Sequence, residues 1–162
     1  FEVPDSLVGR DFLMVTRVAG VPGAGGFQSA GSSLNERLIR WDRVNDRVLL
    51  KSVSTGAVAD DSLPIARSVA QNNYPAIIGA FPIAAFGRDS AAYVIDVTDF
   101  FANDNPATSG LDANARRTYG VRRYDAARSY ISSVIGIDKI SFMSEISTDC
   151  FSFIFTNIYP EI

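Results

Sequence analysis

Pairs of aspartates are the residues whose spacing comes nearest to that of a catalytic site in this chain. Asp96 and Asp99 lie three positions apart, and Asp60 is followed directly by Asp61. Two carboxylates at a suitable separation hydrolyse a glycosidic bond, one as the acid and the other as base or nucleophile. Aspartate is equally a common turn and cap residue, so structural roles are the simpler explanation. A carboxylate-dependent hydrolase that uses Asp96 and Asp99 is the third of our hypotheses.

The chain contains no histidine, and this absence removes most other hydrolytic chemistry. Ser-His-Asp triads, Cys-His dyads and HExxH zinc sites all need an imidazole. A Ser-Lys pair needs a lysine in the S-x-x-K motif, and neither Lys51 nor Lys139 lies in one. The single cysteine, Cys150, lies in an apolar, strand-like run, which favours a packed thiol over a reactive one. We expect no catalytic residue, no bound cofactor and no metal ligand in this chain.

Two further patterns resemble ligand-binding motifs, and each has a plainer explanation. The glycines of residues 20–26 miss the last position of G-x-G-x-x-G and precede no helix, which is typical of a flexible connector. Five arginines between residues 116 and 128 are interleaved with tyrosines, an arrangement able to stack single-stranded nucleic acid. The net charge is −3, with 15 cationic against 18 acidic side chains. A solvated face is therefore expected, and nucleic acid is not a predicted partner.

Size and composition indicate what must position these residues. The chain has 162 residues, of which 47% are hydrophobic and 20% are charged. We expect a single β-rich domain over residues 1–162, since this length suits one domain and the composition is not that of a disordered protein. The apolar run at residues 150–155 is too short to cross a bilayer, so no membrane span is predicted. The start at Phe1 rather than methionine suggests a segment of a longer protein.

The clearest element is a β-hairpin. Residues 38–43 and 47–53 alternate in polarity and flank Asn45 and Asp46, which both tolerate the positive φ of a tight turn. This turn would place Trp41 opposite Leu50 on one face and Arg40 opposite Lys51 on the other, with Arg43 opposite Val48 and Asp42 beside Arg40.

Other segments extend this pattern. Residues 12–18 form a β-rich run, and residues 76–86 and 91–98 form a second strand pair around residues 87–90. The second pair is apolar on both faces, which predicts central, covered strands, and Pro82 predicts a bulge or an edge. We expect Thr98 or Asp99 to cap a short helix, a polar loop at residues 103–112, and a helix over residues 126–134 capped by Asp125. Residues 139–146 and 150–158 return to strand alternation.

The predicted fold class is α+β, predominantly antiparallel β, with strand hairpins and a few short helices, because tight turns link most adjacent runs. An all-β sandwich is the alternative.

Several segments resemble one protein family. They are FEVPDSLVGRDFL at residues 1–13, GSSLN at 31–35, IRW at 39–41, VIDVT at 94–98 with Phe101, and Asp125 with Arg128 and Ser129. Together they resemble the uncharacterised domain that precedes the catalytic domain in large, exported, bacterial zinc-dependent metalloproteases. The similarity covers roughly residues 1–133, and none of its motifs is catalytic.

The resemblance implies a non-catalytic accessory or scaffolding domain of a secreted bacterial zinc metallopeptidase. In that family a later domain carries the HExxH helix, so zinc is expected in the catalytic domain of the parent protein. The implied partners are that catalytic domain, in the same polypeptide, and peptide substrate. The implied location is secreted or periplasmic. The domain would help to shape the peptide-binding cleft, for example by offering a sheet edge to an extended peptide.

The main alternative is a stand-alone β-rich module that binds carbohydrate or protein. Exposed aromatic side chains on one sheet face, such as Trp41 or Tyr93, would favour it. The side chains that we expect to form an interaction surface are aromatic: Trp41, Phe151, Phe153 and Phe155.

Overall fold

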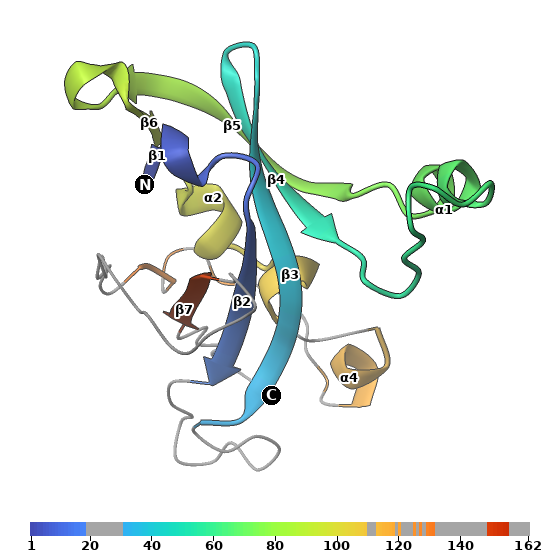
Figure 1. Cartoon of the computed structure of the whole chain (residues 1–162). Helices are drawn as coiled ribbons and strands as arrows, with labels where there is room; N and C mark the ends of the chain where they lie inside the picture. The colour runs from blue at the N-terminus through green and yellow to red at the C-terminus, as the bar shows by residue number, and fades with distance from the viewer. Residues whose placement is uncertain are drawn as a thin grey trace. The chain divides into compact units, whose positions relative to one another are not determined.

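The computed structural model describes residues 1–18, 31–109, 113–118, 120, 125, 127, 129–131 and 149–155 (Figure 1). They form two compact units. Unit 1 contains Phe1–Phe12 and Arg37–Ile95, and unit 2 contains Leu13–Glu36 and Asp96–Ile162. Two of the three boundaries between the units, after Phe12 and after Glu36, fall inside strands, and the third follows Ile95.

Strands dominate the described residues, and each helix is short. The strands are β1 (Glu2–Pro4), β2 (Asp11–Val18), β3 (Ser33–Val44), β4 (Arg47–Val53), β5 (Ala76–Phe86), β6 (Ala92–Ile95) and β7 (Asp149–Phe155). The α-helices are α1 (Ala66–Asn72), α2 (Thr98–Phe101), α3 (Pro106–Ser109) and α4 (Ala113–Thr118), with 3-10 turns at η1 (Asp5–Leu7) and η2 (Arg88–Ser90).

The strand pairing is antiparallel, as expected. Within unit 1 the neighbouring strands follow the order β1-β6-β5-β4-β3, and within unit 2 the order is β3-β2-β7. The pairs β1–β6, β3–β4, β4–β5 and β5–β6 are all antiparallel. The predicted class, predominantly antiparallel β with a few short helices, is confirmed at this level.

The β3–β4 hairpin has the predicted register. Trp41 lies opposite Leu50, Arg43 opposite Val48 and Arg40 opposite Lys51. Asn45 takes a positive φ of 55° in the two-residue turn, which asparagine tolerates better than most residues. The sequence pattern and the turn chemistry therefore agree on which face of each strand is buried.

Strand β5 lies between two neighbours, but it pairs with them over different stretches. Its residues 76–82 lie opposite β4, and residues 83–86 lie opposite β6. Bulges occur where β4 passes Leu50 and Lys51, and again between Ile83 and Ala85. The bulge expected near Pro82 is thus found just after it, where β5 leaves β4 and joins β6.

Each unit has its own core. In unit 1 the buried side chains come from every strand, and they include Phe12, Ile39, Trp41, Val48, Leu50, Phe81, Tyr93 and Ile95. The rings of Trp41 and Phe81 lie 5.9 Å apart. In unit 2, Phe100 and Phe101 of α2 are buried with their rings edge to face. The Thr16 hydroxyl of β2 is buried there and donates to the Asn35 carbonyl at 3.1 Å.

Two expectations about coverage and capping are wrong. Strand β5 is largely exposed rather than covered, although β6 is buried. Neither Thr98 nor Asp99 caps α2. Instead the Asp96 carboxylate accepts a hydrogen bond from the Thr98 amide at 2.9 Å, because an aspartate can bond the backbone two residues ahead.

Three short helices differ from the sequence expectation. Helix α3 lies inside the segment 103–112 that we expected to be a polar loop, and its Ala107, Thr108 and Ser109 are buried. Helices α1 and α4 were not expected. Asp125 accepts from the Ala127 amide at 3.0 Å, as a cap would, but residues 129–131 are not helical, so the expected helix 126–134 is wrong there, and the rest of it, apart from Ala127, lies outside the described residues. The expected strand 139–146 also lies outside them.

Candidate functional site

The feature of unit 1 most suited to binding is one side of β5. Residues 76–80 of β5 pair with β4 on one side, and β6 joins β5 only from Ile83 onward. Among the strands that the structure describes, none pairs with the other side of residues 76–80. We call this stretch the open edge. Unpaired backbone groups on a strand edge are a template for another strand.

The register shows which backbone groups face the open side. Phe81 lies opposite Val48, and the nearby Ile83 amide donates to the Asp46 carbonyl at 2.9 Å, toward the β4 side. Antiparallel ladder positions alternate between bonded and non-bonded pairs. The residues opposite Leu49 and Lys51, which are Ala80 and Ile77, therefore direct their amide and carbonyl groups away from β4.

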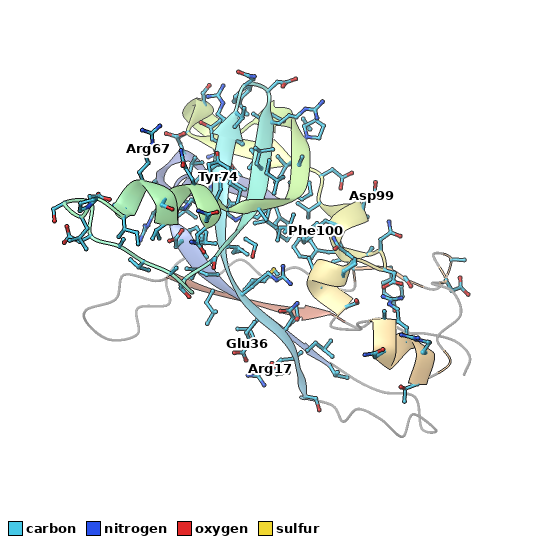
Figure 2. All side chains as sticks on the ribbon, turned by 90° about the vertical axis from the view of Figure 1, so that its right-hand side faces the viewer. Arg17, Glu36, Arg67, Tyr74, Asp99 and Phe100 are labelled. Atoms are coloured by element: carbon cyan, nitrogen blue, oxygen red, sulfur yellow. The ribbon has the colours of Figure 1, made fainter. Side chains whose placement is uncertain are left out.

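The side chains of the open edge are apolar and mostly small. Ala76, Gly79 and Ala80 offer little bulk, while Ile77 is 57% exposed. Tyr74, just before β5, is 74% exposed (Figure 2). Small side chains permit close approach of a second backbone, and Ile77 and Tyr74 supply apolar surface beside it.

Ion pairs organise the charged residues on the adjacent strands. The Lys51 ammonium lies 2.7 Å from the Asp42 carboxylate and 5.7 Å from the centre of the Tyr74 ring. The Arg40 guanidinium binds both carboxylate oxygens of Asp11, at 2.6 and 3.0 Å. The hydrogen bond to Asp11 raises the pKa of Arg40 above its ordinary value. Charges on these strands are thus paired with one another, and the open edge itself carries none.

The connection between β4 and β5 is the second notable feature, and we call residues 54–75 the β4–β5 arm. Helix α1 belongs to it and has no buried residue. The arm exposes Val58, Leu63 and Ile65 in addition to Tyr74. Arg67 extends from α1, and the arm leads directly into the open edge (Figures 1 and 2). Exposed apolar side chains gathered in one connection are typical of an interaction site.

The arm is structured at its acidic turn. The Asp60 carboxylate accepts hydrogen bonds from the Ser62 hydroxyl at 2.6 Å and from the Ser62 amide at 2.9 Å. These bonds lower the pKa of Asp60, the hydroxyl contributing most. The turn role expected for this aspartate pair is confirmed for Asp60.

The aromatic residues that we expected on a surface lie elsewhere. Trp41 is only 5% exposed and packs in the core of unit 1, because its position opposite Leu50 places it on the buried face of the hairpin. Tyr93 is 4% exposed; its hydroxyl donates to Asp5 and accepts from Arg43. Phe151, Phe153 and Phe155 belong to β7, but their side chains are not among those described, so their role stays a prediction.

The carboxylates Asp96 and Asp99 show no sign of a shared catalytic environment. Both are exposed. Hydrogen bonds from the Thr98 side chain and backbone lower the pKa of Asp96. A general acid in a hydrolase needs the opposite shift, because it must hold its proton near neutral pH.

The other patterns are only partly described. Arg116 pairs with Asp104, and Arg117 donates to Asn114 at 2.9 Å, which agrees with the expected solvated, ion-paired surface. Arg122, Arg123 and Arg128 lie outside the described residues, as does the glycine segment 20–26. Cys150 lies in β7, as its apolar neighbours indicated, and its side chain is not described.

The described residues include neither a metal-binding cluster nor a membrane-spanning helix. No three Cys, Asp or Glu side chains there are grouped so that they could hold a metal ion. No helix in that part of the chain has the length and apolar character to span a bilayer.

The open edge was not predicted as a site, although signals for it exist in the sequence. Its residues are uncharged, three of the five are small, and they end two positions before Pro82, which we associated with a bulge or an edge. What the sequence does not show is that β6 begins to pair only after this proline.

These features define an antiparallel, β-rich protein with an open strand edge and an apolar arm. Residues 31–150 match the family model described as "Domain of unknown function (DUF5117)". Since this match covers more than half of the chain, the chain belongs to that family. No curated protein and no solved structure matches it.

Proposed function

We propose that this chain is a non-catalytic accessory domain of a secreted bacterial zinc metallopeptidase, where it contacts the catalytic domain and helps to shape the peptide-binding cleft. The proposal rests on the resemblance of segments such as VIDVT and IRW to domains in such proteases. It also fits a chain without histidine, which lacks the usual base and zinc ligand of peptide hydrolysis.

The observation that carries the proposal is the β4–β5 arm. Its Val58, Leu63 and Ile65 are exposed, and none of the seven residues of α1 is buried. Large apolar side chains that are exposed in one connection are surface available to a neighbouring domain. Contact with a neighbouring domain would remove them from water and stabilise the pair by about 25 cal/mol for each Å² of apolar surface buried. Zinc would be held by the neighbouring domain, not by this chain.

The proposal is tested on the product of the whole gene. We expect an HExxH segment downstream of Ile162 and zinc-dependent cleavage of peptides by the purified product. Deletion of residues 1–162 should raise KM for peptides or leave the catalytic domain insoluble, whereas the triple variant Val58→Ser, Leu63→Ser, Ile65→Ser should weaken the contact without unfolding unit 1. Absence of an HExxH segment, or unchanged solubility, KM and kcat after deletion, would overturn the proposal.

A stand-alone module that binds another protein is the second candidate. The exposed aliphatic side chains of the arm favour protein as its ligand; of the aromatic residues, Trp41 and Tyr93, which we expected to be exposed, are buried, although Tyr74 and Phe86 are exposed. Carbohydrate modules commonly stack sugars on exposed aromatic rings. A gene product that ends near Ile162 and captures a separate polypeptide through the arm would support this second candidate.

A further inference from the structure

We propose that the open edge of β5 binds an extended stretch of substrate peptide as an added β-strand, through the outward-facing backbone of Ile77 and Ala80. This inference deepens the proposed function and rests on it for the identity of the peptide as substrate. The binding step itself depends only on the geometry of unit 1.

The backbone of the open edge has the donors and acceptors that a strand requires. Ile77 and Ala80 both direct an amide and a carbonyl away from β4. The bulge at Ile78 separates these two residues by three positions, so an added extended polypeptide bonds them on either side of the bulge and not in unbroken alternation. A small polar molecule would satisfy one of them and leave the other to water.

The open edge lacks two of the devices that usually block such pairing, charge and proline, but it has a third, because the bulge opposite Leu50 leaves Ile78 as an extra residue within residues 76–80. Natural edges are protected by charged side chains, by proline within the strand, by β-bulges, or by a covering element. Residues 76–80 contain no charge and no proline, and Pro82 stands two positions beyond them. In the described part of unit 1, helix α1 precedes this edge without burying any of its own residues.

The side chains near the edge specify the kind of peptide. Ile77 and Tyr74 are exposed and offer apolar contact to alternate side chains of an added strand. Lys51 is already paired with Asp42, so no charged group is left to select a charged peptide at the centre. The expected ligand is an uncharged stretch of about five residues, rich in β-branched side chains.

A second copy of this chain is a less suitable occupant. Two copies each carry a net charge of −3 and repel one another. A peptide substrate has no such constraint. Self-association is nevertheless a measurable outcome of the test.

The test uses the 162-residue chain and a fluorescent probe, Ac-KTVTVTVTK-amide. The matched control is the same peptide with N-methyl groups on its five central amides, which keeps side chains and charge but removes the donors on both edges. We expect binding of the first peptide in fluorescence anisotropy and at least about tenfold weaker binding of the second, because several hydrogen bonds are lost. Amide NMR signals of Ile77 and Ala80 should shift with the first peptide.

Two variants locate the site on the protein. Ala80→Pro removes an outward amide and should weaken binding by at least about tenfold. Ile77→Thr keeps β-propensity at an exposed position and should weaken binding by about threefold through lost apolar contact. Val44→Thr is the control, since Val44 is equally an exposed apolar strand residue but lies at the hairpin turn. Circular dichroism verifies that each variant folds. If Ala80→Pro does not fold, the effect of Ile77→Thr on binding still decides the test.

Every outcome decides the question. Equal binding of both peptides would show that side chains or charge hold the probe, and the inference would be wrong. No binding of either peptide would also overturn the inference, and sedimentation at several concentrations would then show whether a second copy occupies the edge. The proposed function fails separately: a gene product without zinc-dependent cleavage refutes it even if the probe binds. Conversely, a chain that ignores the probe while its deletion impairs cleavage refutes only the edge inference.

Discussion

Strand β6 and the first half of β5 are nearly equal in apolar character, yet they lie in opposite environments. β6 pairs with β1 on one side and with β5 on the other, and Ala92, Tyr93 and Ile95 are buried. Residues 76–80 of β5 pair with β4 alone, and Ile77 remains 57% exposed.

The difference arises from what lies beside each strand. Both neighbours of β6 contribute contacts, and the Tyr93 hydroxyl is held between Asp5 of η1 and Arg43 of β3. The Arg43 guanidinium also lies 5.0 Å from the centre of the Tyr93 ring. Beside the first half of β5, Lys51 lies opposite Ile77, and its ammonium is 5.7 Å from the centre of the Tyr74 ring.

The comparison shows that apolar composition alone does not determine whether a strand is covered. An apolar strand is typical of the centre of a sheet, and β6 follows that rule. The open edge departs from it while limiting its exposed apolar area, because Ala76, Gly79 and Ala80 are small. A segment with these properties is able to accept a partner strand.

Backbone amide exchange gives the largest expected contrast. The Val94 amide lies inside the sheet, opposite Ala85 on one side and Glu2 on the other. It should exchange at least about a thousandfold more slowly than the Ala80 amide, because core strands open only near global unfolding and an unpaired edge amide needs no opening. Hydrogen exchange followed by NMR measures both. Equal protection of Ala80 would show that the edge is covered in solution.

Truncation of one isoleucine on each strand gives the next contrast. Ile95→Ala should destabilise the protein by about 2–5 kcal/mol, because Ile95 is only 2% exposed and its removal leaves a cavity. Ile77→Ala should change the free energy of unfolding by at most about 0.5–1 kcal/mol, as for other surface positions. Urea unfolding of the two variants measures the difference. Similar losses would mean that Ile77 is covered in solution.

Much of this contrast could be predicted from sequence, and the register of the β3–β4 hairpin most directly. Alternating polarity with Asn45 and Asp46 at the turn allows one register, since a shift by one residue would expose Trp41 and Leu50. The bounds of β5 also follow from its apolar run between Pro75 and Gly87. The turn at Asp60 follows from its short spacing to Ser62.

The coverage of β5 could not be predicted, because it depends on where β6 begins to pair. That depends on the bulge between Ile83 and Ala85 and on tertiary contacts that local pattern does not encode. Trp41 was also expected to form an interaction surface. Its position opposite Leu50 instead places it on the buried face of the hairpin. The cap of α2 had a local signal that was missed: Asp96 precedes Thr98 by two residues, the spacing of an Asx turn.

A smaller effect distinguishes the two tyrosines nearest these strands. Tyr93→Phe should destabilise the protein by about 1–3 kcal/mol. The buried Tyr93 hydroxyl bonds Asp5 and Arg43, and its removal leaves these two side chains without this partner. Tyr74→Phe, at a position 74% exposed, should change stability by less than about 0.5 kcal/mol. Thermal unfolding of both variants provides the measurement. An equal effect would show that the Tyr93 hydroxyl contributes nothing to the packing of β6.

The smallest expected effects are those of pH on two aspartates near these strands. Asp60 lies in the arm that precedes β5, and Asp96 directly follows β6. Hydrogen bonds to the carboxylate depress both pKa values below the ordinary 3.8, with Ser62 and Thr98 as the respective donors. A depressed pKa means that the stabilisation is present above about pH 4 and is lost as pH falls through the folded-state pKa.

Carboxyl NMR titration of two variants separates these sites. Ser62→Ala should raise the pKa of Asp60 toward its ordinary value and leave Asp96 unchanged, because the Ser62 hydroxyl is the main donor. Thr98→Val should raise the pKa of Asp96 alone. One turn follows the buried strand β6, and the other lies in the arm before the exposed half of β5. If the two pKa values rise by similar amounts, the local turn chemistry is the same in both places. The contrast between β6 and β5 then arises from strand pairing. A pKa of Asp60 that ignores Ser62→Ala would contradict this division, since another group would then hold the arm.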